Sequence, residues 1–452
     1  MSVGVATPAA DDDTVAAPLT VAFATLGCKV NQYDTATMET FLAAHGCRVV
    51  AFDAGADVYV VNTCTVTDGA DADSRRFARR ARRQNPSARV VVTGCFAQTS
   101  PRQAAAVDGV DYVVGIGRLP DILRTVRGEI APGEGNVFVH DVRKDTQVRT
   151  LGAEVFRGQT RAFLKVQEGC DLFCSFCIVP FARGKSRSVE PRRVLAEIAK
   201  LAALGFREVV LTGVHLGGYG RDLAPRLDLA DLIEMIADRS PIERVRLSSI
   251  DPPEMTERLL RTVAASDVLC PHFHVPVQAA SDGVLRRMRR QYDVAALRET
   301  IERIVAIVPE CGLGTDVIAG FPGESDAEFA AGVAELSAMP FSYFHVFPYS
   351  SRRGTTAAKA VDPLPRAVVL DRARRLRELG GRKRDEFHQR RVGRRLSVLI
   401  EKHRDPGSGL LIGYDRSYAR VLLDGGDDLG NQIVSVRGVE RVGDRILGEL
   451  PR

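Results

Sequence analysis

The sequence lacks the features that mark membrane, secreted and disulfide-rich proteins. No stretch approaches the ~18 consecutive apolar residues of a membrane span, so we expect no membrane association. The opening residues, MSVGVATPAADDDT, have neither the basic start nor the apolar core of a signal peptide. Nine cysteines are too few, and odd in number, for a disulfide scaffold in 452 residues. These absences predict a cytoplasmic protein with reduced thiols, in which grouped cysteines bind metal or act in catalysis.

The remaining composition is that of an ordinary globular chain. Hydrophobic residues make up 45% and charged residues 26%, which excludes wholesale disorder and collagen-like structure. At ~150 residues per domain, the length predicts about three domains. Residues 1–18 are small and acidic, and we expect them to form a disordered tail.

The net charge of +5 hides two basic runs. Residues 366–404 contain 14 Lys and Arg against 5 Asp and Glu, and residues 75–83 contain six arginines. Each run could be a solvated helix face or a phosphate-binding surface. The candidate nucleic-acid contacts are Arg75, Arg79 and Arg83, one stripe on a helix, and Arg382, Lys383, Arg384, Arg394 and Arg395.

Alternating strand and helix patterns predict two α/β domains. In residues 19–130, strands at 21–26, 57–62, 89–93 and 112–114 alternate with helices at 33–45 and 74–84, which indicates a parallel sheet. Residues 131–158 are predicted to be a linker. In residues 159–388 we expect a partial (β/α)6 barrel that ends in the basic helix, or alternatively an open doubly wound sheet. Its strands are predicted at 162–167, 208–211, 244–248, 272–277, 314–319 and 343–347.

The last segment, residues 389–452, changes to short strands separated by turns. They are predicted at 396–401, 409–414, 420–423, 432–436 and 446–450. This pattern indicates a small all-β barrel in the size class of oligonucleotide-binding barrels.

One group of cysteines is local, in the segment Cys170-Asp-Leu-Phe-Cys174-Ser-Phe-Cys177. Three thiolates within eight residues can cap one face of an iron–sulfur cube and leave one iron open for a small molecule. Zinc is the alternative, but residues 178–190 supply no fourth Cys or His. Because the segment follows the first barrel strand, we expect it at the mouth of the barrel.

A second group is dispersed. Cys28, Cys64 and Cys95 each follow a predicted strand, and the carboxyl ends of parallel strands converge on one crevice. They could meet at a second metal group, or they could be structural. Cys47, Cys270 and Cys311 have no such pattern and are interpreted as structural.

The local segment, with Phe176 before its last cysteine, resembles the radical S-adenosylmethionine superfamily, in which the open iron binds S-adenosylmethionine (SAM). Together with the dispersed group, residues 19–452 resemble the methylthiotransferase family. That resemblance implies two [4Fe-4S] clusters: an auxiliary one on Cys28, Cys64 and Cys95, and a SAM-cleaving one on the local triad. It also implies that the C-terminal barrel is a TRAM domain that binds RNA.

Short sequence motifs favour one branch of this family. The segment Thr25-Leu-Gly-Cys-Lys-Val-Asn-Gln-Tyr-Asp34 is similar to the branch acting on N6-threonylcarbamoyladenosine, whereas the isopentenyladenosine branch usually has Gln-Met-Asn after its first cysteine. The chain departs from the pattern in its N-terminal tail and in Asp251-Pro-Pro253, which replaces a more usual Glu-Pro. We expect neither departure to touch a cluster ligand.

The resemblance implies a tRNA methylthiotransferase in which SAM is both methyl donor and radical source. The partners would be the tRNA anticodon loop, an electron donor such as flavodoxin or ferredoxin, and an unknown sulfur source. Isopentenyladenosine tRNA, a ribosomal-protein aspartate, and a non-catalytic iron–sulfur RNA-binding protein are the alternatives. No catalytic side chain is expected beyond the cluster ligands.

Further contacts are predicted from position alone. Gly213, His215, Gln278, Gly320 and Glu324 follow barrel strands and could contact the cofactor, or serve turns and local hydrogen bonds. Arg183, Lys185 and Arg187 follow the cysteine loop and could contact cofactor or RNA phosphate, or be solvated.

Overall fold

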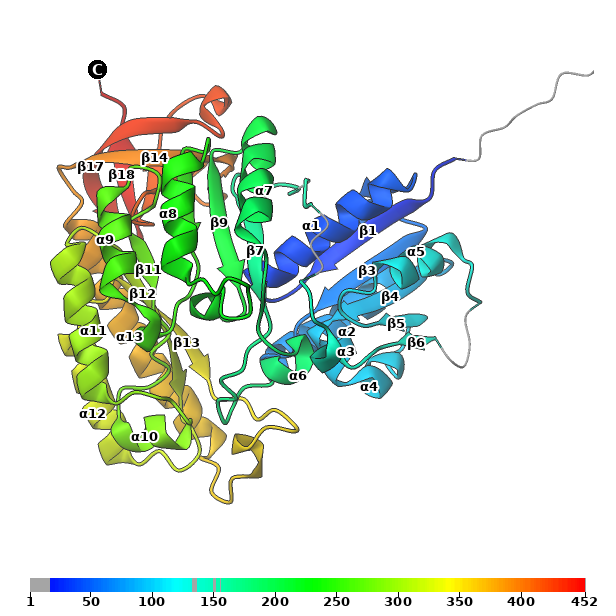
Figure 1. Ribbon diagram of the computed structural model, residues 1–452, viewed down its shortest axis with the longest axis horizontal. Helices are drawn as coiled ribbons and strands as arrows, with labels where there is room; N and C mark the ends of the chain where they lie inside the picture. The colour runs from blue at the N-terminus through cyan, green and yellow to red at the C-terminus, as the bar shows by residue number, and fades with distance from the viewer. Residues whose placement is uncertain (1–16, 132–135, 149–151, 155, 452) are drawn as a thin grey trace, which may run out of the picture.

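The computed structural model describes residues 17–131, 136–148, 152–154 and 156–451. The predicted N-terminal tail therefore lies almost entirely outside the described residues. Figure 1 shows an N-terminal α/β part, a central part built on parallel strands, and a C-terminal β-barrel that packs on one end of the central strands. Among the described helices, none is long and apolar enough to span a membrane.

The N-terminal part is a parallel six-stranded sheet in the order β2-β1-β3-β4-β5-β6. Helices α2, α3 and α4 pack against one face through small residues, and α1 and α5 cover the other face with larger apolar side chains. The elements are β1 (Thr20–Thr25), α1 (Lys29–Ala44), β2 (Arg48–Val50), β3 (Val58–Thr63), α2 (Asp68–Gln84), β4 (Arg89–Gly94), α3 (Cys95–Thr99), α4 (Pro101–Ala105), β5 (Tyr112–Val114), α5 (Leu119–Arg127) and β6 (Val137–Phe138).

Two strands of this sheet were not expected. β2 has three residues and β6 has two, too short to show a periodic pattern. β6 lies inside residues 131–158 and pairs with β5, so part of the expected linker extends the sheet.

The central part follows the predicted six-strand pattern. Strands β7, β9, β10, β11, β12 and β13 lie side by side in chain order and run parallel, with only isolated bridges between β10 and β11. The order contains no reversal, so the doubly wound alternative is wrong. The strands are β7 (Ala162–Glu168), β8 (Arg187–Ser188), β9 (Glu208–Gly213), β10 (Arg244–Leu247), β11 (His272–His274), β12 (Gly312–Ala319) and β13 (Tyr343–Pro348).

The helices of the central part cover these strands on the outside. Capping boxes at Asp228/Asp231 and Ser325/Glu328 fix the starts of α8 and α12, because each pair satisfies backbone N–H groups that the helix leaves free. The helices are α6 (Val179–Arg183), α7 (Pro191–Ala203), α8 (Leu229–Arg239), α9 (Glu257–Ala265), α10 (Asp282–Arg287), α11 (Val294–Ile307), α12 (Asp326–Ala338) and α13 (Arg366–Gln389).

The C-terminal part is a closed barrel in the order β14-β15-β16-β18-β17, as the short strands predicted. Inward-facing Leu396, Val398, Val421, Val436 and Ile446 fill it. Its strands are β14 (Arg395–Arg404), β15 (Leu411–Asp415), β16 (Arg420–Leu423), β17 (Ile433–Val442) and β18 (Arg445–Glu449).

The turn between β15 and β16 docks on the amino-terminal ends of the central strands. Arg246 of β10 donates hydrogen bonds to the carbonyls of Asp415 and Arg416, at 3.2 and 2.8 Å. A Cβ on Gly312 would lie 1.8 Å from the carbonyl oxygen of Ser417, so this strand start must be glycine. The small barrel therefore closes the end of the central barrel opposite the cysteine loop.

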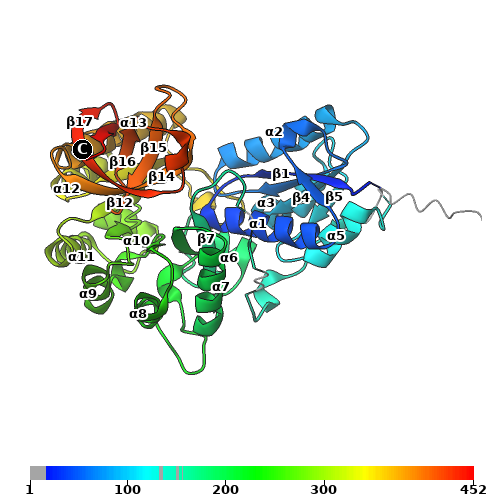
Figure 2. The same cartoon turned by 90° about the horizontal axis from the view of Figure 1, so that it is seen from above.

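The N-terminal part approaches the central barrel along its first strand. Figures 1 and 2 show α1 lying beside β7, and the two elements are in contact. The carboxyl ends of β1, β3 and β4 thereby face the barrel. This arrangement brings the two cysteine groups to one side of the molecule.

Candidate active site built on two cysteine triads

The local triad forms a loop directly after β7. Gly169 opens it with φ +77°, and a Cβ there would lie 1.9 Å from the carbonyl oxygen of Lys185, so only glycine allows this close return of the chain. The amide of Cys170 donates to the carbonyl of Gly184 at 3.0 Å, which ties the loop to its own exit. The loop thus lies at the carboxyl ends of the barrel strands, as expected.

The three thiols of this loop are half-buried and close enough to influence one another. Burial, with a smaller contribution from the neighbouring Cys174, raises the pKa of Cys170 and of Cys177 to about 12. Such thiols become good ligands once a metal stabilises the thiolate. A single zinc ion would draw its ligand sulfurs to within about 4 Å of one another. Among the described residues, neither cysteine triad has all three sulfurs within 4.8 Å of one another, so at least one pair of sulfurs in each triad is spaced more widely than around a single zinc ion.

Arg290 is a neighbour of this loop that the sequence pattern did not reveal. Its guanidinium donates to Cys174 Sγ at 3.3 Å, pairs with Asp251 at 2.7 Å and stacks on Tyr292. The departure at Asp251 therefore reaches a proposed ligand through one intervening side chain.

The dispersed triad converges, as the parallel sheet predicted. Cys28 precedes α1, Cys64 follows β3 and Cys95 begins α3. Burial raises the pKa of Cys64 to about 12, and the nearby Cys95 and Cys28 add to the shift. Gly27, with φ +93°, leaves room for this approach, since a Cβ there would lie 2.8 Å from Cys64 Sγ.

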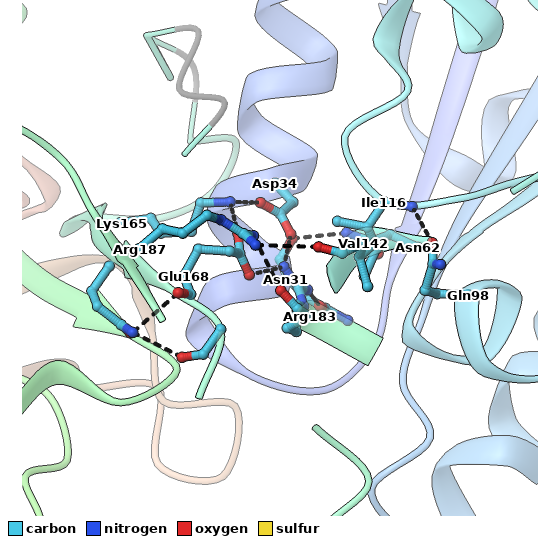
Figure 3. A network of polar contacts seen from close by, with 12 residues as sticks. Asn31, Asp34, Asn62, Gln98, Ile116, Val142, Lys165, Glu168, Arg183 and Arg187 are labelled. Atoms are coloured by element: carbon cyan, nitrogen blue, oxygen red, sulfur yellow. Dashed lines mark hydrogen bonds and ion pairs between the residues drawn. The ribbon is translucent and has the colours of Figure 1, made fainter. Parts of the chain in front are cut away.

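A buried ionic network joins the two triads. Arg183 of α6, the helix that directly follows the local triad, donates to Asp34 Oδ2 at 2.6 Å and to Glu168 Oε1 at 3.0 Å. Lys165 of β7 binds the same two carboxylates, at 2.6 and 2.5 Å. Figure 3 shows these side chains meeting between α1 and the end of β7, with Asn31 as a further acceptor for Arg183.

The positive and negative side chains of this network compensate one another, which lowers the free-energy cost of burying them. Burial alone would raise the pKa of Asp34, but Lys165 and Arg183 hold it below its usual value. Arg183 also lies beside Cys95 of the dispersed triad. It is buried, not solvated, and Arg187 is likewise buried, whereas Lys185 is exposed. Lys165 and Glu168 were not predicted, although charged residues within a buried strand were a usable signal.

A cavity of about 590 Å³ lies beside the segments that follow one cysteine of each group. Thr65, which follows Cys64, lines one side, and Ile178, which follows Cys177, lines the other. Buried Arg352 contributes a third side and pairs with Asp71 at 2.6 Å. The volume is in the range of small-molecule sites and suits a nucleoside.

The five residues predicted to contact the cofactor lie at the expected strand ends, and their side chains or amides contact neighbouring residues of the protein. The amide of His215 donates to Gln167 Oε1 at 2.8 Å, and its ring lies 2.8 Å from Glu254. Glu324 accepts from the amide of Gly320 and pairs with Arg372. Gly213 packs on Gln167, and Gln278 continues the sheet beside β12. Cofactor contact by these five residues stays a prediction.

The predicted nucleic-acid contacts divide by exposure. Lys383 donates to the carbonyl of Met339 at 2.9 Å at the end of α12, and Arg394 pairs with Glu310. Arg75 is half-buried. Six of the predicted contacts are exposed: Arg79, Arg83, Arg382, Arg384, Arg394 and Arg395.

Two family models match this chain, and each match contains one of the two cysteine triads. Residues 20–115 match the Uncharacterized protein family UPF0004, and residues 164–334 match the Radical SAM superfamily. Among solved structures, the radical S-adenosylmethionine methyltransferase TsrM from Kitasatospora setae, with cobalamin and a [4Fe-4S] cluster bound, superposes with a TM-score of 0.53. At 18% identity over 74% of this chain and 76% of that one, the likeness shows the fold alone.

Curated relatives match nearly the whole chain. Threonylcarbamoyladenosine tRNA methylthiotransferase MtaB of Aquifex aeolicus is 41% identical over 84% of this chain and 92% of its own length. MtaB of Bacillus subtilis is 38% identical over 92% and 93%. The tRNA-2-methylthio-N(6)-dimethylallyladenosine synthase of Pelotomaculum thermopropionicum is 31% identical over 91% and 93%.

Proposed function

This chain belongs to the radical SAM methylthiotransferase family, and we propose that it converts N6-threonylcarbamoyladenosine next to the anticodon of tRNA into its 2-methylthio derivative. The approach of the two cysteine triads, whose segments are joined through Arg183, carries the proposal, because the reaction needs a sulfur source and a SAM-binding centre within reach of one base. Relatives named for this substrate are 34–41% identical to this chain, against 28–33% for relatives named for the dimethylallyl substrate.

Each triad is proposed to hold one [4Fe-4S] cluster. Cys170, Cys174 and Cys177 would hold the SAM-binding cluster, while the auxiliary cluster would sit on Cys28, Cys64 and Cys95. When bound, the clusters and SAM supply the electron, the radical and the sulfur that a carbon–hydrogen bond of low acidity requires. The protein positions them: Gly27 and Gly169 allow close backbone approach, and Arg183 holds the two loops in register.

The tRNA is proposed to approach over the basic helices α2 and α13, with the small C-terminal barrel acting as an RNA-binding TRAM domain. The target base would enter the cavity as an unstacked loop nucleotide. A flavodoxin or ferredoxin would deliver electrons, in the cytoplasm.

Nucleoside analysis tests the substrate assignment. Anaerobically reconstituted protein is incubated with SAM, a reductant and anticodon stem-loop RNA that carries either threonylcarbamoyladenosine or isopentenyladenosine. We expect the 2-methylthio product from the first RNA alone. Product from the second alone would reassign the substrate. Absence of 5′-deoxyadenosine in every reaction would favour a non-catalytic RNA-binding protein.

A further inference from the structure

Two histidines and one aspartate lie together on the inner wall of the central barrel. His274 is on β11, Asp316 on β12 and His345 on β13, three strands that pair in parallel. Side chains alternate between the two faces of a strand, and the neighbouring Phe273 and Val317 pack into the core beneath the outer helices (Figure 1). The three polar side chains therefore point into the barrel.

One carboxylate oxygen joins these three side chains. Nε2 of His274 lies 2.8 Å from Oδ1 of Asp316, and Nδ1 of His345 lies 3.2 Å from the same atom. The two imidazole rings lie side by side, with centroids 5.0 Å apart. In the part of the chain that the structure describes, this is the only set of three such residues whose ligand atoms all lie within 4.8 Å of one another. One ion can therefore reach all three.

The spacing and the donor atoms match a first-row transition-metal ion. Bonds from such an ion to imidazole nitrogen and carboxylate oxygen are about 2.0–2.2 Å long, so two ligands at a right angle lie about 3 Å apart. The two nitrogen-to-oxygen distances at Asp316 bracket that value. Two imidazoles and one carboxylate suit divalent iron, and zinc binds the same atoms. Three protein ligands leave further coordination positions open.

Tyr343 holds the ring of His274 from behind. Its hydroxyl lies 3.3 Å from His274 Nδ1 and 2.9 Å from His272 Nε2. The hydroxyl can accept a hydrogen bond from His274 and donate one to His272, which leaves the lone pair of His274 Nε2 facing Asp316. Histidines that bind metals commonly donate their second ring nitrogen in this way. Gly314 makes room for the phenol ring, because a Cβ there would lie 2.1 Å from it.

The group is accessible from one side. The side chain of His345 is 57% exposed and that of Asp316 is 24% exposed, whereas His274 is buried. No lysine or arginine among the described residues lies within ion-pair distance of Asp316. An ion can therefore enter past His345 without displacing a salt bridge.

The group lies deeper in the barrel than the cysteine loop. Ile318, two residues beyond Asp316 on the same face of β12, packs against the same small apolar cluster as Phe176 of that loop. Two residues of a strand span about 7 Å. The open positions of a bound ion would thus face the barrel interior below the local cysteine triad.

We propose that His274, Asp316 and His345 bind one divalent ion of the first-row transition series. This site goes beyond the proposed function, since no cysteine of either triad belongs to it and its ion is additional to the irons of the clusters. Its open positions would take water, or an oxygen or nitrogen atom of a ligand inside the barrel.

Zinc binding to the holoenzyme tests the site. Anaerobically reconstituted protein is washed with EDTA and dialysed against Zn²⁺, and bound zinc is measured by elemental mass spectrometry. We expect about one zinc per chain, and X-ray absorption at the zinc edge should show only nitrogen and oxygen ligands at about 2.0–2.2 Å. Failure of the wild type to bind zinc would overturn the proposal. So would a sulfur shell at about 2.3 Å, which would assign the zinc to cysteines.

Variants separate this site from surface binding. Asp316→Asn and His345→Gln should each lose the bound zinc, and the exposure of His345 makes its replacement unlikely to disturb the fold. Tyr343→Phe should weaken zinc binding by about 10- to 100-fold. His403→Gln, at an exposed histidine of β14, is the matched control and should bind zinc as the wild type does. Iron content reports whether each variant still carries its clusters. Full zinc binding by both ligand variants would contradict the assignment.

Discussion

The guanidinium of Arg183 donates a 2.6 Å hydrogen bond to the carboxylate of Asp34, across the boundary between the N-terminal sheet and the central barrel. Asp34 lies on the helix that begins after Cys28, and Arg183 lies on the helix that begins after Cys177. One ion pair therefore couples the segments that present the two cysteine triads. The geometry of the site depends on two parts of the chain being held together here.

Replacing Arg183 by Met should destabilise the protein and uncouple the two triads. Loss of one member of a buried ion pair leaves its partners uncompensated, which costs about 3 kcal/mol, and Lys165 would offset part of this for Asp34 and Glu168. We expect a lower midpoint in denaturant unfolding, and methylthio product should decrease more than 5′-deoxyadenosine. Arg79→Met, at an exposed arginine, is the control and should unfold as the wild type does. Equal losses of both products would show that Arg183 does not act between the triads.

The two triads should be separable by iron analysis. Wild-type protein reconstituted anaerobically should contain about eight irons per chain, and replacing either triad by Ala should leave about four. Loss of Cys170, Cys174 and Cys177 should abolish 5′-deoxyadenosine formation. Loss of Cys28, Cys64 and Cys95 should leave it measurable but stop methylthiolation. The matched control is Cys47→Ser, at a buried cysteine packed in the core under the N-terminal sheet. This variant should keep all of the about eight irons per chain.

Much of this site could be predicted because its signals are local. The spacing of the Cys170 loop, its place after a strand, and the three strand-end cysteines are all patterns within a few residues. All six barrel strands were expected close to where they lie. The parallel sheet then brings Cys28, Cys64 and Cys95 together without further information.

The parts that could not be predicted depend on contacts between distant segments. Asp34 and Lys165 are separated by 131 positions, and Arg290 and Cys174 by 116, so no local pattern marks either pair.

The stripe on α2 should contribute to tRNA affinity through charge alone. Arg79 and Arg83 are exposed, whereas Arg76 and Arg80 of the same helix pair with Asp73 and Asp53. Changing Arg79 and Arg83 to Gln should weaken binding about tenfold at low salt and make the slope of log K against log salt shallower by about 2, because each phosphate contact releases counterions. Fluorescence anisotropy at several salt concentrations measures both.

The paired arginines of α2 supply the control for that experiment. Arg76→Gln with Arg80→Gln removes the same charge, but from side chains already neutralised by neighbours. This double variant should change the slope of log K against log salt less than the change of Arg79 and Arg83 to Gln does. Identical slopes for the two double variants would mean that the helix contributes only a general field and not a contact surface.

Glu39 of α1 should make the stability of the protein depend on pH near neutrality. Burial raises the pKa of its carboxyl to about 7, and Arg157, at 3.8 Å, offsets this only in part. Because the folded state holds this proton more tightly than the unfolded chain, the stabilisation is complete below the unfolded pKa of ~4.3 and is lost as pH rises through 7. Between pH 6 and 8 the free energy of unfolding should decrease by about 1 kcal/mol on account of this group. The free energy of unfolding of Glu39→Gln, measured with denaturant, should lack that decrease and should exceed that of the wild type at pH 8. The free energy of unfolding of Glu299→Gln, at an exposed carboxylate, should follow that of the wild type. A decrease of the same size in Glu39→Gln would assign the pH dependence to another group.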